Sequence, residues 1–487
     1  MCFPFQWLTI KIKRFFSKLF ASTYTIFSKE IFYMLLTDII QDNERVYIGE
    51  AIPDLYRYDE YIGTADNIYG VALPKTKEEL IALVKFAKQE NLPIIARGAG
   101  TGLSGATTPI KGELIIDVHL MNRILDLDTE TMTLTVEPGV LLQDIQEYVE
   151  SRGYFYPPDP GSKHSSIGGN VATNAGGMRA VKYGVTRNYV RALDVVLASG
   201  EELSLGSLNI KDSSGYDLKD LFIGSEGTLG ITTQIKLKLI PLPKASLSLT
   251  VAFPSLNDAT DAVLTILKNG VDPTALEFFE RDVIELSEAE NNLKFPSQKG
   301  QSYLLITLDG EDRESIDRRV NLLEASVLPH QAIEIIPLTD PVLEKTAWFL
   351  RDKLLTAVVN YTEQVTLDET VPINHVSTLY HYTKELEANS GLKLISFGHA
   401  GDGNLHTCIT RGEIADQTEW EMKRDHVLHL LYAKIKELGG LPSAEHGIGI
   451  IKKPYLEKMS DPNYLHFMRQ IKGIFDPDGR LNPTKVI

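Results

Sequence analysis

Short blocks of hydrophobic residues in the N-terminal half predict brief strands and few helices. A capping box at Thr76 and Glu79 precedes apolar positions at helical spacing, so we expect a helix over about 77–90. A second helix is expected over 141–151. Apolar or alternating runs predict strands at 92–97, 113–118, 131–137, 192–198 and 231–239. Between 154 and 184 the chain is rich in Gly, Pro, Asn and Ser without a clear period, which is typical of a functional loop system or a linker.

The C-terminal half has longer periodic segments. They predict, in order, a strand at 246–253, a helix at 256–269, a strand at 302–308 and a helix at 311–328, which together suggest a small sheet covered by helices. Further strands are expected at 393–397 and 405–410, and helices at 418–438 and 461–475. Pro241 and Pro243 favour a domain boundary between the two halves. The pattern as a whole predicts an α+β protein.

Length and composition narrow the class of protein. A chain of 487 residues is long enough for two or three domains, and 43% hydrophobic with 23% charged residues is ordinary for a globular protein. The net charge of −16 argues against nucleic acid as a partner. Because Cys2 and Cys408 are the only cysteines, a disulfide framework, a four-cysteine zinc site and an iron–sulfur cluster held by this chain alone are excluded. We therefore expect a reducing, cytoplasmic compartment.

Residues 1–33 differ from the rest of the chain. No acidic residue occurs before Glu30, and the basic residues fall on a different helical face from the apolar ones. Such a basic amphipathic segment is typical of peripheral contact with an anionic membrane, here the inner face. The alternative is a dispensable segment, with the protein proper starting at Met34. No apolar run in it approaches the 18 residues of a membrane span.

Residues Gly100 to Gly105 match the dinucleotide fingerprint G-x-G-x-x-G, but their surroundings do not fit it. A Rossmann loop opens a helix, whereas residues 106–112 are too few for a crossover helix and include Pro109. We therefore predict a loop that returns directly to a strand and cradles a diphosphate with its backbone N–H groups; the alternative is a plain tight turn. Further glycine-rich segments occur at 157–162, 167–177 and 224–230, which suggests a large cofactor lying against backbone.

Taken together, these segments resemble a known family. RGAGTGLSGA, PPDPGS, IGGNVATNAGG with KYG, and GSEGTLGI are similar to the FAD-binding domain of the vanillyl-alcohol oxidase and p-cresol methylhydroxylase type. FGHAGDGNLH, PSAEHGIG and FDPDGRLNP resemble the branch that holds the FAD-bearing subunit of glycolate oxidase, D-lactate dehydrogenase and D-2-hydroxyglutarate dehydrogenase. The resemblance runs from about residue 40 to 487. It implies a two-part FAD-binding domain over 34–244, an α+β cap domain with an antiparallel sheet over 245–440, and a C-terminal helical segment over 441–487 that returns to the FAD domain.

The resemblance also implies which residues contact the cofactor, bound without a covalent link. The implied FAD-binding residues are Arg97, Gly98, Ala99, Gly100, Thr101, Gly102, Leu103, Ser104, Pro158, Asp159, Ser162, Ser166, Gly168, Gly169, Asn170, Ala172, Asn174, Gly176, Gly177, Tyr183, Gly184, Glu226, Gly227, Gly230, Ile231 and Asn482. Glu277 lies in an A-L-E segment near the implied cap hinge, and we assign it no chemical role.

A pair of histidines in the C-terminal half suggests a metal site. Asp402-Gly403 is typical of a two-residue hairpin turn, and pairing outward from it places His399 directly opposite His406. One divalent metal could bind both rings, and Glu445 would complete a site of two histidines and one carboxylate. The alternative is a hydrogen-bonded pair in the core. The resemblance favours the metal, for which we expect zinc or manganese.

Two further residues suit the oxidation of a 2-hydroxy acid. His446 could take the hydroxyl proton, the alternative being a structural histidine that holds a loop. Arg351 matches the W-x-x-R pattern of the family and could bind a carboxylate; the alternative is a surface pair with Asp352 or Glu344. Where the 2-hydroxyglutarate enzymes have Lys and Asn, this chain has Thr366 and Cys408, which favours a smaller monocarboxylate.

The sequence thus predicts FAD-dependent oxidation of D-lactate or glycolate to the 2-oxo acid, with hydride transfer to flavin N5. Three alternatives stay open, of which the first two are a D-2-hydroxyglutarate dehydrogenase and the FAD-bearing subunit of a multi-subunit glycolate oxidase that is inactive alone. A metal-binding protein with a vestigial flavin domain is a third. The electron acceptor is expected to be a quinone, an electron-transfer flavoprotein, a cytochrome or oxygen.

Overall fold

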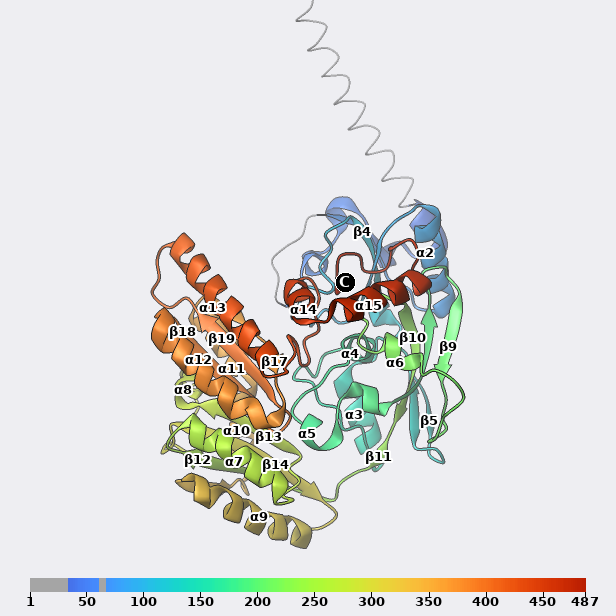
Figure 1. The fold of residues 1–487 in the computed structure, drawn as a ribbon. Helices are drawn as coiled ribbons and strands as arrows, with labels where there is room; N and C mark the ends of the chain where they lie inside the picture. The colour runs from blue at the N-terminus through green and yellow to red at the C-terminus, as the bar shows by residue number, and fades with distance from the viewer. Residues whose placement is uncertain (1–33, 61–66) are drawn as a thin grey trace, which may run out of the picture.

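The computed structural model describes residues 34–60 and 67–487. The predicted amphipathic segment over 1–33 lies outside the described residues. In the described part of the chain, no helix is long and apolar enough to cross a membrane. The chain forms two parts that lie side by side, with the C-terminal helices returning to the N-terminal part (Figure 1).

The N-terminal part contains two sheets. The first has the order β1-β2-β4-β3 and is parallel except for β1, with strands Val46–Tyr47, Ile68–Ala72, Glu113–Asp117 and Ile94–Arg97 in that order. The second is antiparallel in the order β5-β6-β10-β8-β9, with strands Ile124–Asp128, Thr133–Val136, Ile231–Lys238, Val190–Val196 and Glu202–Gly206. A short antiparallel pair is formed by β7 (Tyr154–Phe155) and β11 (Ile240–Pro241). The helices are α2 (Lys77–Gln89), α3 (Leu142–Glu150), α4 (Ile167–Thr173), α5 (Ala180–Tyr183) and α6 (Lys219–Phe222).

The second part, which we call the cap, is a three-layer unit. Its antiparallel sheet has the order β15-β12-β14-β13-β18-β19-β16, and β17 (Glu369–Thr370) also pairs with β19. In that order the strands are Glu334–Pro337, Ala245–Phe253, Ser302–Gly310, Ala275–Glu280, Lys393–His399, Asn404–Thr410 and Gln364–Thr366. One face packs its apolar side chains against α7 (Leu256–Lys268), α9 (Arg313–Val327), α12 (Val376–Ser390) and α13 (Gln417–Glu437). The other face packs against α8 (Arg281–Asn291), α10 (Pro341–Asp352) and α11 (Leu354–Tyr361).

The C-terminal segment rejoins the N-terminal part after the cap is complete. It carries α14 (Lys453–Met459) and α15 (Pro462–Phe475), and α15 packs Phe475 against Phe222 with ring centroids 5.0 Å apart. The chain then runs beside β3, where the Ile94 N–H donates to the Arg480 carbonyl at 2.8 Å and the Asn482 N–H donates to the Ile94 carbonyl at 2.7 Å. This return brings residues near both ends of the chain to the same site.

The structure confirms the α+β class and most of the expected elements, with four corrections. The stretch 154–184 is not wholly irregular, because it contains α4, which is capped by Ser166, whose hydroxyl accepts from the Gly169 N–H. Two glycines in the first turn of α4 conceal the helix in the sequence. In the cap, β13 and α8 lie between the expected helix 256–269 and strand 302–308. Glu277 therefore lies in the middle of the cap sheet rather than near a hinge.

The hairpin register was also predicted wrongly. β18 and β19 pair Phe397 with His406 and His399 with Asn404, so His399 and His406 are diagonal neighbours on one face rather than directly opposite. The connection is the four-residue loop 400–403. Only Gly403 of the proposed two-residue turn has a positive φ, +88°, whereas a type I′ turn needs positive φ at both positions.

Candidate active site

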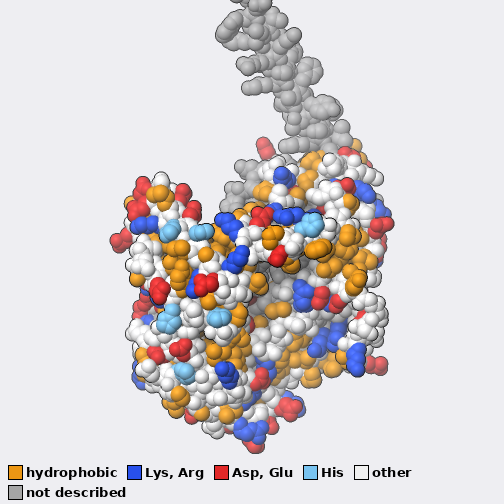
Figure 2. All heavy atoms as spheres, in the orientation of Figure 1, with side chains coloured by type: hydrophobic (Ala, Val, Ile, Leu, Met, Phe, Trp, Pro, Cys, Tyr) orange, Lys and Arg blue, Asp and Glu red, His pale blue; other side chains and the backbone are white. Residues whose placement is uncertain are grey.

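A cavity of about 450 Å³ lies between the two parts of the molecule. One wall comes from the glycine-rich loops of the N-terminal part, and the opposite wall comes from α10, α11, the β18–β19 hairpin and the loop 443–449. In the space-filling view the surface is indented between the two parts (Figure 2). Both the predicted cofactor loops and the predicted catalytic residues therefore face one space.

The first wall presents backbone N–H groups to the cavity. The loop after β3 reaches β4 without a helix, as predicted, and the N–H groups of Gly100, Thr101 and Gly102 have no acceptor among the described residues. Gly100 has φ +74°. Arg97 stands behind this loop, where its guanidinium donates to the carbonyls of Leu55 and Tyr58. Unpaired N–H groups that face a cavity fit an anion such as the diphosphate of FAD.

Most of the implied FAD residues line this cavity. They are Arg97, Gly98, Ala99, Gly100, Thr101, Gly102, Leu103, Ser162, Ser166, Gly168, Gly169, Asn170, Ala172, Gly176, Glu226, Gly227, Gly230 and Asn482. Eight others do not appear in its lining: Ser104, Pro158, Asp159, Asn174, Gly177, Tyr183, Gly184 and Ile231. Several of these eight hold the loops in place instead. Asp159 binds Lys163 and Arg179, and the Tyr183 hydroxyl donates to Asp309 of the cap at 2.8 Å.

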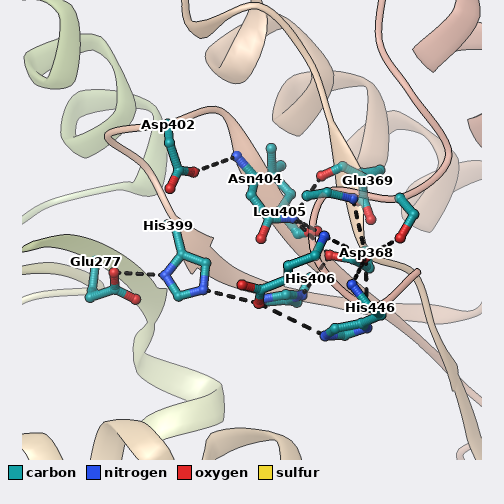
Figure 3. Close-up of polar contacts among 12 residues, drawn as sticks. Glu277, Asp368, Glu369, His399, Asp402, Asn404, Leu405, His406 and His446 are labelled. Carbon is teal, nitrogen blue, oxygen red and sulfur yellow. Dashed lines mark hydrogen bonds and ion pairs between the residues drawn. The ribbon is translucent and has the colours of Figure 1, made fainter. Parts of the chain in front are cut away.

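Three histidines and a carboxylate converge on the opposite wall. The Nε2 atoms of His399, His406 and His446 lie 3.3, 3.5 and 3.9 Å from Oε1 of Glu445. The ring of His406 stacks on that of His446 with centroids 5.2 Å apart and is edge-on to that of His399 at 5.4 Å. Figure 3 shows the three rings in a row, with Glu277 on the side of His399 that faces away from His406 and His446. The predicted residues are thus brought together even though the hairpin register differs.

The protonation of these groups follows from burial and from their neighbours. Burial acts to lower the pKa of His399, but the carboxylates of Glu277 and Glu445 on either side raise it well above its usual value. Burial acts to raise the pKa of Glu445, but the imidazoles of His399 and His406 lower it well below its usual value. For His446, burial dominates and lowers the pKa to about 4. His446 is therefore neutral at physiological pH, although a pKa this low makes it a weaker base than an ordinary imidazole.

The donor set fits a divalent metal. Two imidazole nitrogens and a carboxylate oxygen meet at Glu445, and Nδ1 of His406 is buried without a hydrogen-bond partner. A second grouping offers ligand atoms from Asp368, His406, Glu445 and His446 within 4.8 Å of one another. His406 and Glu445 belong to both groupings. The second grouping has Asp368 and His446 in place of His399, and its Asp368 also accepts hydrogen bonds from backbone N–H groups and from Lys452. Nitrogen and oxygen donors of this kind suit zinc or manganese.

The loop 443–449, which carries Glu445 and His446, is held by two buried carboxylates whose roles the sequence did not reveal. Asp368 of the cap accepts from the N–H groups of residues 444, 445 and 446 at 2.9–3.2 Å, and also binds Lys452 at 2.9 Å. Glu226 of the N-terminal part accepts from the N–H groups of Ile448 and Gly449 at 2.6 and 2.8 Å. Both parts of the molecule therefore fix the position of this loop.

Arg351 lies on the same wall as the histidines. Its side chain is 10% exposed, lines the cavity and forms an ion pair with the fully buried Glu277. The pair with Asp352 that the sequence suggested is also present, with Nη1 3.7 Å from Oδ1, but Arg351 itself does not lie on the surface. Asp352, Leu355 and Thr356 follow it along the wall. Thr366 and Cys408 do not line the cavity, because they face each other across β16 and β19 with Oγ1 and Sγ 3.3 Å apart.

Comparisons with known proteins agree with the two-part architecture. The family described as "FAD binding domain" matches residues 69–206, and the family described as "FAD linked oxidases, C-terminal domain" matches residues 242–486. The chain is similar to a D-lactate dehydrogenase of Anaerostipes hadrus, 41% identical over 461 residues that cover 91% of this chain and 94% of that protein. It is 36% identical to glycolate oxidase subunit GlcD of Bacillus subtilis, with 89% and 92% covered. It is 31% identical to a D-2-hydroxyglutarate dehydrogenase of Stutzerimonas stutzeri, with 85% and 90% covered.

A solved structure shows the same fold at low identity. The structure of p-cresol methylhydroxylase with substrate bound superposes with a TM-score of 0.76 at 16% identity, covering 93% of this chain and 96% of that chain. The predicted p-cresol methylhydroxylase type of fold is therefore confirmed.

Proposed function

Because the chain belongs to the family of FAD-linked oxidases, we propose that it oxidises a small 2-hydroxy acid, D-lactate or glycolate, to the 2-oxo acid. The observation that carries the proposal is a single cavity with a backbone cradle for FAD on one wall, and one arginine beside three histidines on the other. When bound, FAD supplies the two-electron acceptor for this oxidation.

The residues of the cap wall have complementary roles in this proposal. Arg351 binds the substrate carboxylate with its planar guanidinium. His446, which is neutral at physiological pH, takes the hydroxyl proton. His399, His406 and Glu445 would hold a divalent metal, which as a Lewis acid lowers the pKa of a hydroxyl bound to it. All of these protein groups face the same cavity.

The charges on the wall favour a monocarboxylate. Among the described lining residues, Arg97 and Arg351 are the only Lys or Arg side chains, and Arg97 is committed to the loops behind the FAD cradle. Asp352 lies next to Arg351 on the wall, so a second substrate carboxylate would meet a like charge. This charge pattern supports lactate or glycolate over 2-hydroxyglutarate.

Anaerobic reduction of the flavin tests the proposal without knowledge of the electron acceptor. The purified protein is mixed in turn with D-lactate, L-lactate, glycolate and D-2-hydroxyglutarate, and loss of the oxidised flavin absorbance is followed. We expect fast bleaching with D-lactate or glycolate. Faster bleaching with D-2-hydroxyglutarate would support the dicarboxylate alternative. A yellow protein that none of the four bleaches would overturn the proposal and favour a subunit that is inactive alone.

The electron acceptor is identified in the same experiment. Mixing the bleached protein with a quinone analogue, an electron-transfer flavoprotein, a cytochrome or oxygen shows which one restores the oxidised spectrum fastest. These four are the acceptor classes that we propose for this chain.

A further inference from the structure

Glu277 is a buried carboxylate that does not line the cavity but contacts two residues that do. It lies in the middle of β13, and its side chain is 0% exposed. Its Oε1 accepts from Nδ1 of His399 at 2.8 Å. Its Oε2 accepts from Nη2 of Arg351. Both oxygens of one carboxylate are therefore used by two residues of the proposed site.

The two partners come from different layers of the cap. His399 lies on β18, directly across from Glu277 in the register of the sheet, while Arg351 comes from α10, which covers one face of that sheet. Nη2 of Arg351 is only 3.3 Å from Nδ1 of His399. Both nitrogens also contact the Glu277 carboxylate, so the three side chains form one compact cluster. The donation from Nδ1 also leaves Nε2 of His399 turned toward Glu445.

We propose that Glu277 is a positioning residue that fixes the spacing between Arg351 and His399 and thereby selects 2-hydroxy acids. The inference rests on the proposed function, in which Arg351 binds the carboxylate and the histidine cluster receives the hydroxyl. In a 2-hydroxy acid these two groups are on adjacent carbons, so the residues that recognise them must be held at one separation. A fully buried carboxylate shared by both partners can hold that separation.

Two substitutions of Glu277 distinguish the effect of its side-chain position from the effect of its charge. Glu277→Gln keeps the size of the side chain but replaces one acceptor oxygen with an NH₂ group. Because His399 and Arg351 both donate to this side chain, one of the two contacts is lost. Glu277→Asp keeps the charge but withdraws the carboxylate by one methylene, so it cannot reach both partners. If only charge balance with Arg351 mattered, the Asp variant would keep its activity.

The same strand offers a matched control. Glu280 accepts from the Tyr380 hydroxyl at 2.8 Å and from Nζ of Lys384 at 3.0 Å, and it does not line the cavity. Glu280→Gln therefore removes a similarly engaged carboxylate from β13 without touching the site. We expect it to leave the rate of flavin bleaching by the 2-hydroxy acid unchanged.

The experiment measures FAD content, the rate of anaerobic bleaching by D-lactate or glycolate, and inhibition by propionate, which has the carboxylate but no hydroxyl. We expect both Glu277 variants to keep FAD, to lose roughly 10–100-fold in bleaching rate, and to be inhibited by propionate nearly as well as the unmodified protein. The reaction of the hydroxy acid would then be weakened much more than the binding of propionate. A purely structural role of Glu277 would not produce this difference.

The possible outcomes are distinct. If the unmodified protein is bleached and Glu277→Gln is bleached equally fast, the inference alone is overturned. Loss of FAD from both Glu277 variants, with FAD kept in Glu280→Gln, would show a structural role and also overturn it. If no 2-hydroxy acid bleaches the unmodified protein, the proposed function fails and the inference fails with it.

Discussion

The two walls of the cavity differ in what they present to a ligand. The N-terminal wall presents backbone and small side chains, and most of its lining residues are glycine, alanine, serine or threonine. The cap wall presents titratable side chains that shift one another's pKa, such as His399 between Glu277 and Glu445. The first wall should therefore be sensitive to added volume and backbone strain, and the second to the loss of individual functional groups.

The largest effect is expected on the cap wall. His446→Gln removes the group proposed to take the hydroxyl proton, so the rate of flavin reduction should fall by roughly 10²–10⁴-fold. FAD content, measured from the absorbance of the purified protein, should not change. His426→Gln, an exposed histidine on α13, is the control. A variant at position 446 that reduces at the unmodified rate would exclude His446 as the base.

On the N-terminal wall, a substitution is expected to weaken FAD binding rather than to slow flavin reduction. Gly100→Ala places a side chain at φ +74°, and its Cβ would overlap the guanidinium of Arg97, which is held by its own hydrogen bonds. Strain of this kind costs about 1–3 kcal/mol, and overpacking costs a similar amount. We expect a low FAD-to-protein ratio after gel filtration, with near-normal reduction in the fraction that keeps FAD.

Gly473 provides the matched control for this substitution. It lies in α15, and nothing lies within 4 Å of an added Cβ. Gly473→Ala should keep FAD and raise the melting temperature slightly, since alanine stabilises a helix relative to glycine. Equal FAD retention in the two variants would contradict the assignment of the Gly100 loop as the cradle.

A smaller effect is expected where the two walls are joined. Asp309 on β14 binds Lys182 at 2.7 Å and accepts from the Tyr183 hydroxyl, both on α5. Burial acts to raise the pKa of Asp309, but hydrogen bonds from Lys182, Thr274 and Tyr183 lower it overall. Asp309→Asn should reduce stability by about 1.5–3 kcal/mol at neutral pH.

The pH dependence of this loss has a definite sign. A carboxylate whose pKa is depressed in the folded state stabilises the protein above its unfolded pKa of about 4 and ceases to do so as pH falls through the depressed value. The difference in melting temperature between the unmodified protein and Asp309→Asn should therefore be full at neutral pH and shrink below about pH 4. A difference that stays constant into acid would show that the charge of Asp309 does not matter.

The smallest effect concerns substrate choice on the cap wall. Asp352→Asn removes a negative charge from the lining and should improve kcat/KM for D-2-hydroxyglutarate relative to D-lactate by at most about 1 kcal/mol, roughly fivefold. Cys408→Ala is the control, because Cys408 packs in the core and does not line the cavity. If the preference between D-2-hydroxyglutarate and D-lactate changed in Cys408→Ala but not in Asp352→Asn, then Cys408 rather than Asp352 would be the residue that influences substrate choice.

The same contrast explains what the sequence could predict. The glycine spacing of the N-terminal loops predicts their role because glycine acts locally, through its own backbone. His399, His406, Glu445 and His446 stand in glycine-flanked motifs and were also found. The sequence did not reveal that Glu226, Glu277 and Asp368 hold other site residues in place. The role of a buried carboxylate depends on hydrogen-bond donors far away in the chain, such as the N–H groups of 444–446 for Asp368. The acidic residue inside the apolar run 275–279 was the one available signal.

The loop 443–449 has a consequence for how activity arises during folding. Its N–H groups are divided between Asp368 of the cap and Glu226 of the N-terminal part, so neither part alone can give the loop its final shape. A chain in which only one part has folded would therefore lack one of the two carboxylates that hold Glu445 and His446 in place. The roles proposed for Glu445 and His446 therefore require both parts of the molecule to be folded.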